Sequence, residues 1–310
     1  MNILIFSHIA DCDGITPIIL SKLCFNNVDY KLLDNPIDKD FLEYVNNNDF
    51  SKYDYIYMTD LCVSEETIKQ LDDSFLSKFK IFDHHIGNID MNKYDFIQVI
   101  DEENGIKQSG TSLYYNYLIN NFNNGLLNKN STKMLVDLVR QGDTWTFKDN
   151  DAVYIADYLA LVGIEEYINY FINFIKNNDE FYFEDKLKFL FEVEDRKRKL
   201  YIEEKEQQII DIYIKPYNIG VVFAESYRSS LGNALATKYI DKYDFIIVIN
   251  VSRSISYRGV KDINLSDFAS IYGGKGHKLA AGSPLPIKLR ENIIKLIFND
   301  VVIKEDKNAN

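Results

Sequence analysis

The first third of the chain alternates between short apolar runs and segments with helix signals, and this alternation constrains the fold most. Strands are predicted at 2–7, 29–33, 53–59 and 80–82, with helices at 17–25, at 41–47 and from Ser64 onward. Thr16 followed by Pro17 is typical of a helix N-cap and first turn. Strands that alternate with helices indicate an α/β fold, with a mostly parallel sheet flanked by helices.

The rest of the chain is first helical and then returns to an alternating pattern. Residues 109–207 read as helices, and one of them is predicted to start at Ser131 and end at Gly142, which leaves Asp143 just beyond it. The highly charged stretch 184–208 is predicted to be a long connecting helix. From Asn218 the strand signal returns. We therefore expect an N-terminal domain at 1–185, a helical linker at 186–212 and a smaller C-terminal α/β domain at 213–310.

Composition excludes several classes of protein. The chain has 310 residues and three cysteines, none of them in a C-x-x-C pair, which argues against a disulfide framework and a thiolate zinc site. No apolar run is long enough to cross a bilayer, and the first residues lack the features of a signal peptide. We expect a cytoplasmic protein with no membrane partner, and the sequence leaves its oligomeric state open, a homodimer included.

The net charge of −12 bears on which partners the chain can bind. Long duplex nucleic acid is bound through many lysines and arginines, so it is not an expected partner. A small phosphate-bearing substrate remains compatible with the negative charge, because bound cations can invert the local field.

Acidic side chains and histidines follow three of the predicted strands. The chain contains four histidines, and three of them belong to these strand ends, which carry His8, Asp11, Asp13, Asp60, Asp83, His84 and His85. Ligands bind outside the carboxyl ends of the strands in a parallel sheet, so these side chains should converge. Carboxylates packed so closely repel one another unless cations lie between them. The alternative is that Asp11, Asp13 and Asp60 make turns and caps, but the coincidence at three strand ends favours a metal site.

The mixture of imidazole and carboxylate suits manganese, iron or zinc better than calcium, while magnesium prefers oxygen ligands alone. The number of candidate ligands suggests two ions. A pair of ions can hold a hydroxide and clamp the attacking and leaving oxygens at phosphorus.

Five motifs, in order, resemble those of the DHH phosphoesterase superfamily with its associated DHHA1 domain. They are His8-x-x-Asp11-x-Asp13-Gly14, Met58-Thr59-Asp60, Asp83-His84-His85, the stretch 138–145 that contains Asp143, and the glycine-rich stretch 273–282. Together they span residues 5–286. The opening stretch 7–23, the stretch 111–114 and the stretch 138–145 are most similar to the nanoRNase B (NrnB) type of oligoribonuclease.

The resemblance implies roles for individual residues. His8 and Asp11 would bind one divalent ion, Asp13, His84 and Asp143 a second, and Asp60 both. The ions would be Mn²⁺ first of all, with Mg²⁺, Fe²⁺ and Co²⁺ as alternatives. Asp83 would orient a histidine, and His85 would contact the scissile phosphate or protonate the leaving oxygen. The chain departs from many members in having two rather than three residues between His8 and Asp11.

The glycine-rich stretch also has a physical interpretation of its own. Glycines let the backbone approach a ligand, and Gly273, Gly274, Gly276 and His277 could thus bind an anion together with Arg258. A tight turn between packed elements is the alternative. Lys275 stands where many DHHA1 domains have a glycine.

The resemblance therefore implies a phosphodiesterase that hydrolyses short oligoribonucleotides (nanoRNA) to mononucleotides by attack of a metal-bound hydroxide. The substrate would lie in a cleft between the two domains. A cyclic or linear dinucleotide phosphodiesterase and a 3′-phosphoadenosine 5′-phosphate phosphatase are alternatives with the same fold. An inactive nucleotide sensor is the alternative outside enzymes.

Overall fold

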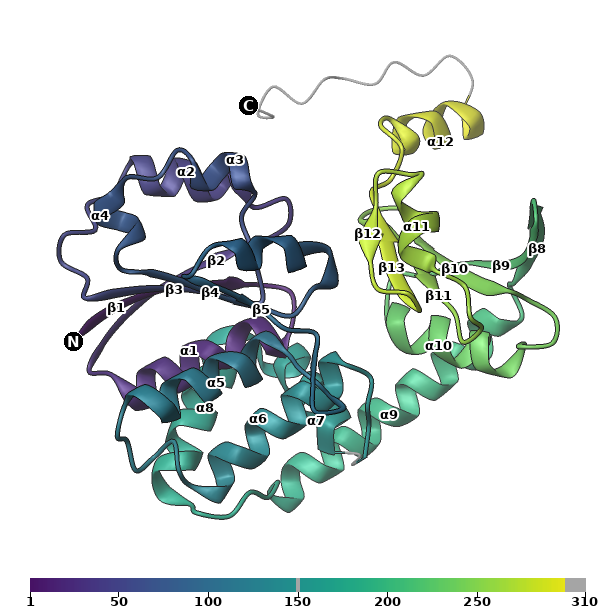
Figure 1. Ribbon diagram of the computed structural model, residues 1–310. Helices are drawn as coiled ribbons and strands as arrows, with labels where there is room; N and C mark the ends of the chain where they lie inside the picture. Colours follow the sequence, from purple (N-terminus) through teal and green to yellow (C-terminus); the bar gives the residue numbers. More distant parts are fainter. Residues whose placement is uncertain (149–150, 299–310) are drawn as a thin grey trace. The chain divides into compact units, whose positions relative to one another are not determined.

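The structure is a computed structural model that describes residues 1–148 and 151–298 (Figure 1). The chain divides into two compact units, of which the first ends at Glu192 and the second begins at Val193. The division falls inside the long helix α9 (Asp185–Glu206), which confirms that the charged stretch is helical. Among the described residues, no helix combines the length and the apolar character that a membrane span requires.

Unit 1 is built on a five-stranded sheet in the order β2-β1-β3-β4-β5, and all neighbouring strands are parallel. The strands are β1 (Asn2–His8), β2 (Asn27–Leu33), β3 (Tyr55–Thr59), β4 (Phe79–Asp83) and β5 (Ile97–Val99). A separate antiparallel pair joins β6 (Glu102–Glu103) to β7 (Ile106–Lys107). The predicted parallel sheet is confirmed, and β5 is a strand that the sequence did not predict.

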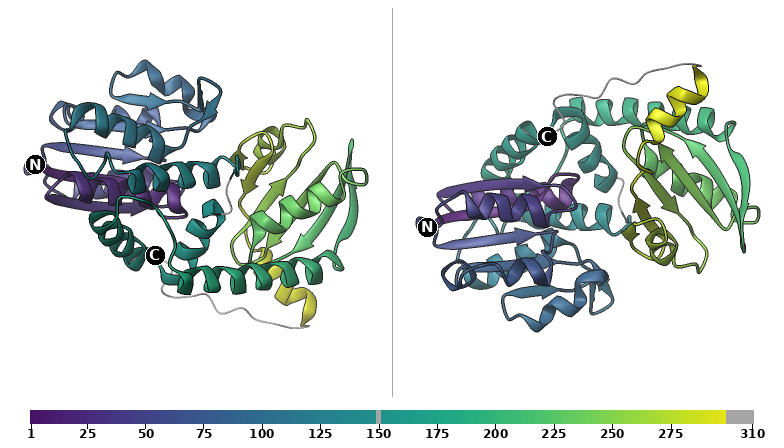
Figure 2. Two further views of the ribbon diagram at one scale, coloured as in Figure 1. Left: turned by 90° about the horizontal axis from the view of Figure 1, so that it is seen from below. Right: turned by 90° about the horizontal axis from the view of Figure 1, so that it is seen from above.

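Helices cover both faces of this sheet (Figures 1 and 2). They are α1 (Cys12–Cys24), α2 (Asp38–Asn46), α3 (Glu65–Ile68), α4 (Asp73–Leu76), α5 (Gly110–Asn121), α6 (Asn130–Asp143), α7 (Asp151–Val162) and α8 (Ile164–Asn177), with a 3₁₀ helix η1 (Ile86–Lys93). Successive residues of a strand face opposite sides. Ile3 and Ile5 of β1 therefore pack in the core beneath α1 and α5, while Leu4 and Phe6 pack in the core beneath α2.

Unit 2 contains a mixed six-stranded sheet in the order β12-β13-β11-β10-β9-β8. Its strands are β8 (Ile210–Ile214), β9 (Tyr217–Phe223), β10 (Phe245–Asn250), β11 (Ser254–Arg258), β12 (Lys275–Gly276) and β13 (Ala280–Ser283), and its helices are α10 (Arg228–Lys238), α11 (Leu265–Ser270) and α12 (Leu289–Ile297). Helix α10 packs on one face of the sheet and α11 on the other. A second α/β unit is thus confirmed.

The predicted start of the first helix was wrong. Helix α1 begins at Cys12, and its N-cap is Asp11, whose side chain accepts a hydrogen bond from Gly14 N at 3.1 Å. Pro17 lies inside the helix and cannot donate to the carbonyl of Asp13, four residues earlier. That carbonyl instead accepts a hydrogen bond from Thr111 Oγ1 at 2.8 Å. A side chain from α5 therefore makes a proline tolerable inside α1.

The predicted limits of the sixth helix were also wrong. Helix α6 has Lys129 rather than Ser131 as its N-cap, and it ends at Asp143 rather than at Gly142. Gly142 does not adopt the left-handed conformation that would end a helix, and the chain turns at Trp145, which has a φ of 55°. Asp143 is consequently held by the last turn of a helix.

Candidate metal centre

The site lies where three parallel strands end side by side. In the sheet, Ser7 of β1 is level with Thr59 of β3, and Thr59 is level with Phe82 of β4. His8 and Asp60 follow the first two of these positions directly. The residues after Phe82 are Asp83, His84 and His85. The strand register therefore brings these side chains to one edge, as the parallel topology predicts.

The six side chains predicted as metal ligands form two adjoining groups. His8, Asp11 and Asp60 offer ligand atoms within 4.8 Å of one another, and so do Asp13, His84 and Asp143. Only two residues separate His8 from Asp11 in the sequence, rather than the three of many family members. Their side chains nevertheless lie close together, with His8 Nδ1 3.6 Å from Asp11 Oδ2.

Asp60 faces both groups with different oxygens. Its Oδ2 lies 3.2 Å from His8 Nδ1, and its Oδ1 lies 3.3 Å from His84 Nε2. The side chain is buried, so its position is set by the protein rather than by solvent. A carboxylate in this position has one oxygen available for each of two neighbouring cations.

Two glycines allow the backbone to approach this closely. A Cβ atom on Gly110, the first residue of α5, would lie 2.6 Å from Asp60 N, and a Cβ atom on Gly14 would lie 2.0 Å from the carbonyl oxygen of His8. Asp60 itself adopts a φ of 57°, a conformation that non-glycine residues rarely adopt. The absence of side chains at both glycines is therefore part of how His8 and Asp60 are positioned.

The start of α5 also holds Asp13. The backbone N–H groups of Gly110 and Thr111 donate hydrogen bonds to its two carboxylate oxygens, at 2.7 and 2.9 Å. Such bonds, together with the positive end of the helix, stabilise a buried carboxylate.

The charges of the centre perturb one another strongly. Burial raises the pKa of Asp13, the neighbouring Asp60 raises it further, and the result is about 6. Burial and the charge of Asp13 raise the pKa of Asp143 well above its usual range. Burial lowers the pKa of His8, but hydrogen bonds with Asp11 and Asp60 outweigh this and raise it to about 10. Burial and neighbouring carboxylates therefore destabilise the ionised forms of Asp13 and Asp143, which is the situation that a divalent cation relieves.

The donor set fits divalent transition metals. It combines four carboxylates with two imidazoles, which are ligands suited to manganese, iron or zinc. The buried Oδ2 of Asp143 accepts no hydrogen bond within the described part of the chain, although His84 Nε2 lies 3.3 Å away. This oxygen is thus available to a cation.

Asp83 and His85 form a hydrogen-bonded pair beside these groups. Asp83 is completely buried and accepts a hydrogen bond from His85 Nδ1 at 2.7 Å and one from Asn88 Nδ2 at 2.6 Å. The ring of His85 is nevertheless 42% exposed. Burial lowers the pKa of His85, but the hydrogen bond and the charge of Asp83 outweigh this and raise it. Asp83 thus fixes the orientation of the His85 ring through its Nδ1.

The predicted substrate-binding residues lie in unit 2. Arg258 is the last residue of β11, Gly276 is in β12, and His277 follows in the turn to β13. The glycine-rich stretch is therefore a β-hairpin rather than an open loop. A Cβ atom on Gly274 would lie 2.2 Å from Gly282 O, and Gly273 has a φ of 71°. Close packing explains Gly274 without a ligand, and the left-handed backbone explains Gly273.

No protein-family model matches the chain. A search of curated proteins, however, finds the oligoribonuclease NrnB of Bacillus subtilis, which is 31% identical over 318 residues that cover 97% of this chain and 77% of the relative. The chain belongs to the NrnB family of DHH phosphoesterases.

Solved structures agree with this assignment at the level of the fold. RecJ from Thermus thermophilus in complex with Mn²⁺ matches 97% of this NrnB-family chain with a TM-score of 0.54 and 13% identity, and the match spans 53% of RecJ. The pGpG-specific phosphodiesterase PggH from Vibrio cholerae matches 96% of the chain with a TM-score of 0.50 and 13% identity. The predicted fold is confirmed, and the chain is a DHH-family phosphoesterase.

Some residues near the site were missed by the sequence reasoning. Asp34 Oδ1 lies 3.8 Å from His8 Nε2, and Asp34 directly follows β2, which is the strand next to β1. Ligands bind beyond the carboxyl ends of parallel strands, and this principle, taken for β2 as well, points to Asp34. Asn88, which holds Asp83, had no comparable signal in the sequence.

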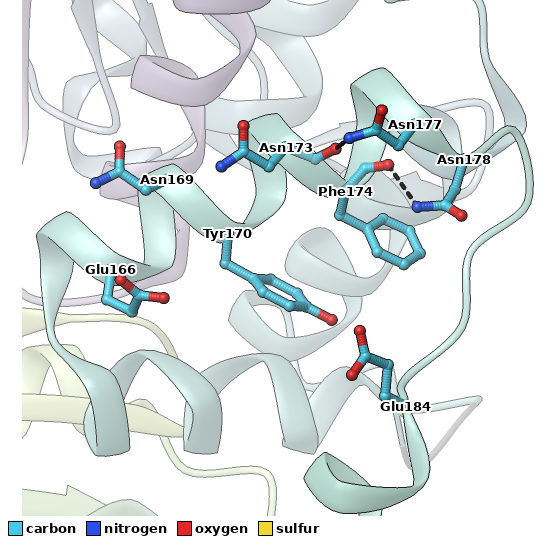
Figure 3. A pocket seen from close by; sticks show the side chains of 8 residues that line it. All are labelled: Glu166, Asn169, Tyr170, Asn173, Phe174, Asn177, Asn178 and Glu184. Carbon is cyan, nitrogen blue, oxygen red and sulfur yellow. Dashed lines mark hydrogen bonds between the residues drawn. The ribbon is translucent and has the colours of Figure 1, made fainter.

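A polar pocket of unit 1 lies apart from the predicted site residues, since none of them lines it (Figure 3). It is lined by Glu166, Asn169, Tyr170, Asn173, Phe174, Asn177, Asn178 and Glu184, mostly from one side of α8. The family assignment gives this pocket no role.

Proposed function

We propose that the chain hydrolyses the phosphodiester bonds of short oligoribonucleotides, releasing mononucleotides, with two divalent cations of which Mn²⁺ is the first candidate. The observation that carries the proposal is the position of Asp60, which lies between His8 on one side and His84 on the other. His8 and Asp11 would hold one ion, and Asp13, His84 and Asp143 the other.

When bound, the ions supply Lewis acidity and an activated water. The remaining steps belong to protein groups. Asp83 accepts the hydrogen of His85 Nδ1 and stabilises the protonated ring. His85 Nε2 then contacts the scissile phosphate or donates a proton to the leaving oxygen.

Unit 2 would bind the end of the substrate. Arg258, His277 and the hairpin residues Gly273, Gly274 and Gly276 are the groups we propose for this. In this proposal the catalytic domain comprises residues 1–185, a linker 186–212 and the substrate-binding domain 213–310. Similarity to an oligoribonuclease and the net charge of −12 support short substrates over long duplexes.

The test is a hydrolysis panel with Mn²⁺. It compares di- to pentaribonucleotides with long single-stranded RNA, cyclic dinucleotides, 3′-phosphoadenosine 5′-phosphate and pyrophosphate. The proposal predicts the highest kcat/KM on two- to five-residue RNA. Faster turnover of any other substrate would replace it, and nucleotide binding without turnover of any of them would indicate a sensor.

A further inference from the structure

An exposed aromatic pair follows the last predicted ligand of the metal centre. Trp145 comes two residues after Asp143 and is 40% exposed. Phe147 is 41% exposed, and the two rings meet edge to face, with centroids 5.3 Å apart and planes at 85°. Two residues of chain span at most about 7 Å, so the backbone of Trp145 lies beside that of Asp143.

Trp145 occupies a backbone position that normally belongs to glycine. Helix α6 ends at Asp143, and Thr146 N donates a hydrogen bond to Gln141 O at 3.1 Å across the helix end. This bond is typical of the Schellman motif, in which the residue at the place of Trp145 is left-handed and usually glycine. The φ of 55° at Trp145 is unfavourable for a residue with a Cβ atom. Packing does not explain a tryptophan here, because a large part of it faces solvent.

The segment that carries the aromatic pair is anchored to the helix. Gln141 is buried, and its Oε1 accepts a hydrogen bond from Lys148 N at 2.8 Å. Its Nε2 donates to Asp137 Oδ2 at 2.7 Å. Trp145 and Phe147 therefore present their rings from a segment that is held on both sides. A surface that is already ordered loses little entropy when it binds a ligand.

The neighbouring metal centre indicates which ligand the aromatic pair binds. A phosphodiester held at the centre carries a nucleoside on each side, and the base is the aromatic, uncharged part of that nucleoside. An exposed indole binds a base by stacking, and it accepts any base because every base has a π face. Trp145 thus offers, next to the predicted ligand Asp143, the contact that the non-phosphate part of a nucleotide requires.

We propose that Trp145, in contact with Phe147, is a stacking platform for a nucleobase next to the scissile phosphate. The proposal rests on the proposed function and adds a base-binding contact in unit 1 to the binding residues proposed in unit 2. Substrates that lack a base, such as pyrophosphate, gain nothing from this platform, whereas every dinucleotide gains affinity from it.

Fluorescence tests the platform without hydrolysis. Trp145 is the only tryptophan in the chain, so its emission reports on this position alone. The full-length protein is titrated in Mg²⁺ with adenosine 5′-monophosphate and, separately, with ribose 5-phosphate, which has the same sugar and phosphate but no base. We expect the nucleotide to quench the emission along a saturable curve and ribose 5-phosphate to leave it unchanged. Equal changes with both ligands, or no change with the nucleotide up to millimolar concentration, would overturn the proposal.

Dinucleotide hydrolysis in Mn²⁺ tests the same contact during turnover. Glycine adopts the left-handed conformation readily, so Trp145→Gly removes the ring and keeps the helix end. We expect Trp145→Gly to raise KM about fivefold to a hundredfold with a much smaller change in kcat. Trp145→Phe should recover much of this loss, because it retains a ring that can stack. Circular dichroism checks that each variant folds.

Phe189→Ala is the matched control, because it removes another exposed aromatic ring of unit 1, on α9. This variant should keep the KM of the parent. A parent-like KM in Trp145→Gly, or an equal rise in Phe189→Ala, would overturn the proposal. Dinucleotides that lack one base sharpen the test: for one of the two possible positions of the missing base, Trp145→Gly should raise KM no further. A full additional rise for both positions would also overturn it.

Failure of this proposal can be told apart from failure of the proposed function. Quenching by adenosine 5′-monophosphate without turnover of any substrate would reject the proposed function and retain the base-binding platform. Dinucleotide turnover with a KM that does not depend on the ring at Trp145 would reject the platform alone.

Discussion

Gly110 offers a sharp test of how the metal centre is positioned, because the atoms nearest to a methyl group there are the backbone N, the Cα and the Cβ of Asp60. The Cβ atom of Gly110→Ala would lie 2.6 Å from Asp60 N and 2.8 Å from Asp60 Cα. Heavy atoms that touch without strain are about 3.5 Å apart, so the start of α5 and Asp60 must separate by roughly 0.9 Å. A displacement of about 1 Å at a catalytic group can lower the rate by about a hundredfold.

The same substitution strains the backbone around Asp60 and the bonds from the start of α5 to Asp13. Overpacking of this kind costs about 1–3 kcal/mol in stability. We expect Gly110→Ala to lower kcat/KM for a dinucleotide by about a hundredfold at saturating Mn²⁺ and to lower the melting temperature by several degrees. Steady-state kinetics over a range of Mn²⁺ concentrations, with thermal unfolding alongside, provides both readouts.

Gly125→Ala is the matched control. Gly125 lies in a turn of the same unit, and a Cβ atom there has nothing within 4 Å. This variant should keep the kinetics of the parent. If Gly110→Ala is folded and retains kcat/KM to within about threefold of Gly125→Ala, the idea that Gly110 positions Asp60 is wrong.

Three further variants have expected outcomes. Thr111→Val leaves the buried carbonyl of Asp13 without its donor and should reduce the free energy of unfolding by about 1–3 kcal/mol, measured with urea; an unchanged midpoint would contradict this. Gly232→Ala places a Cβ atom 2.7 Å from Cγ of Arg258, a proposed substrate-binding residue, and should raise KM for a dinucleotide about tenfold, although alanine ordinarily stabilises a helix. An unchanged KM would count against Arg258 as a substrate-binding residue. His85→Gln should lower kcat by about 10²–10⁴-fold with Mn²⁺ affinity retained, and a parallel loss of Mn²⁺ affinity would make His85 a ligand instead.

The position of the candidate metal centre at one edge of the sheet could be predicted from the sequence, because the carboxyl ends of parallel strands lie together. Once 2–7, 53–59 and 80–82 were read as strands, His8, Asp60 and His84 had to meet at one edge. Asp34 follows the same rule, because it comes directly after β2, which pairs in parallel with β1.

Other parts of the site depend on contacts that a linear pattern does not contain. Asp143 comes from a helix far along the chain, and only the family resemblance pointed to it. Gly14 lies so close to the backbone of His8, and Gly110 so close to the backbone of Asp60, that neither position has room for a methyl group. Likewise, Ser229 and Arg258 are far apart in the sequence, and the hydrogen bond between them arises from the packing of α10 against the sheet.

The central claim is that Asp60 joins two metal-binding groups in a phosphodiesterase. The most direct test is a calorimetric titration of metal-free protein with Mn²⁺, combined with dinucleotide hydrolysis at each point, for the parent and for Asp60→Asn. We predict that the parent binds two ions per chain and that activity follows occupancy of the second site. Asp60→Asn should lose both two-ion binding and activity. Full activity with a single bound ion, or parent-like binding and turnover in Asp60→Asn, would contradict the account.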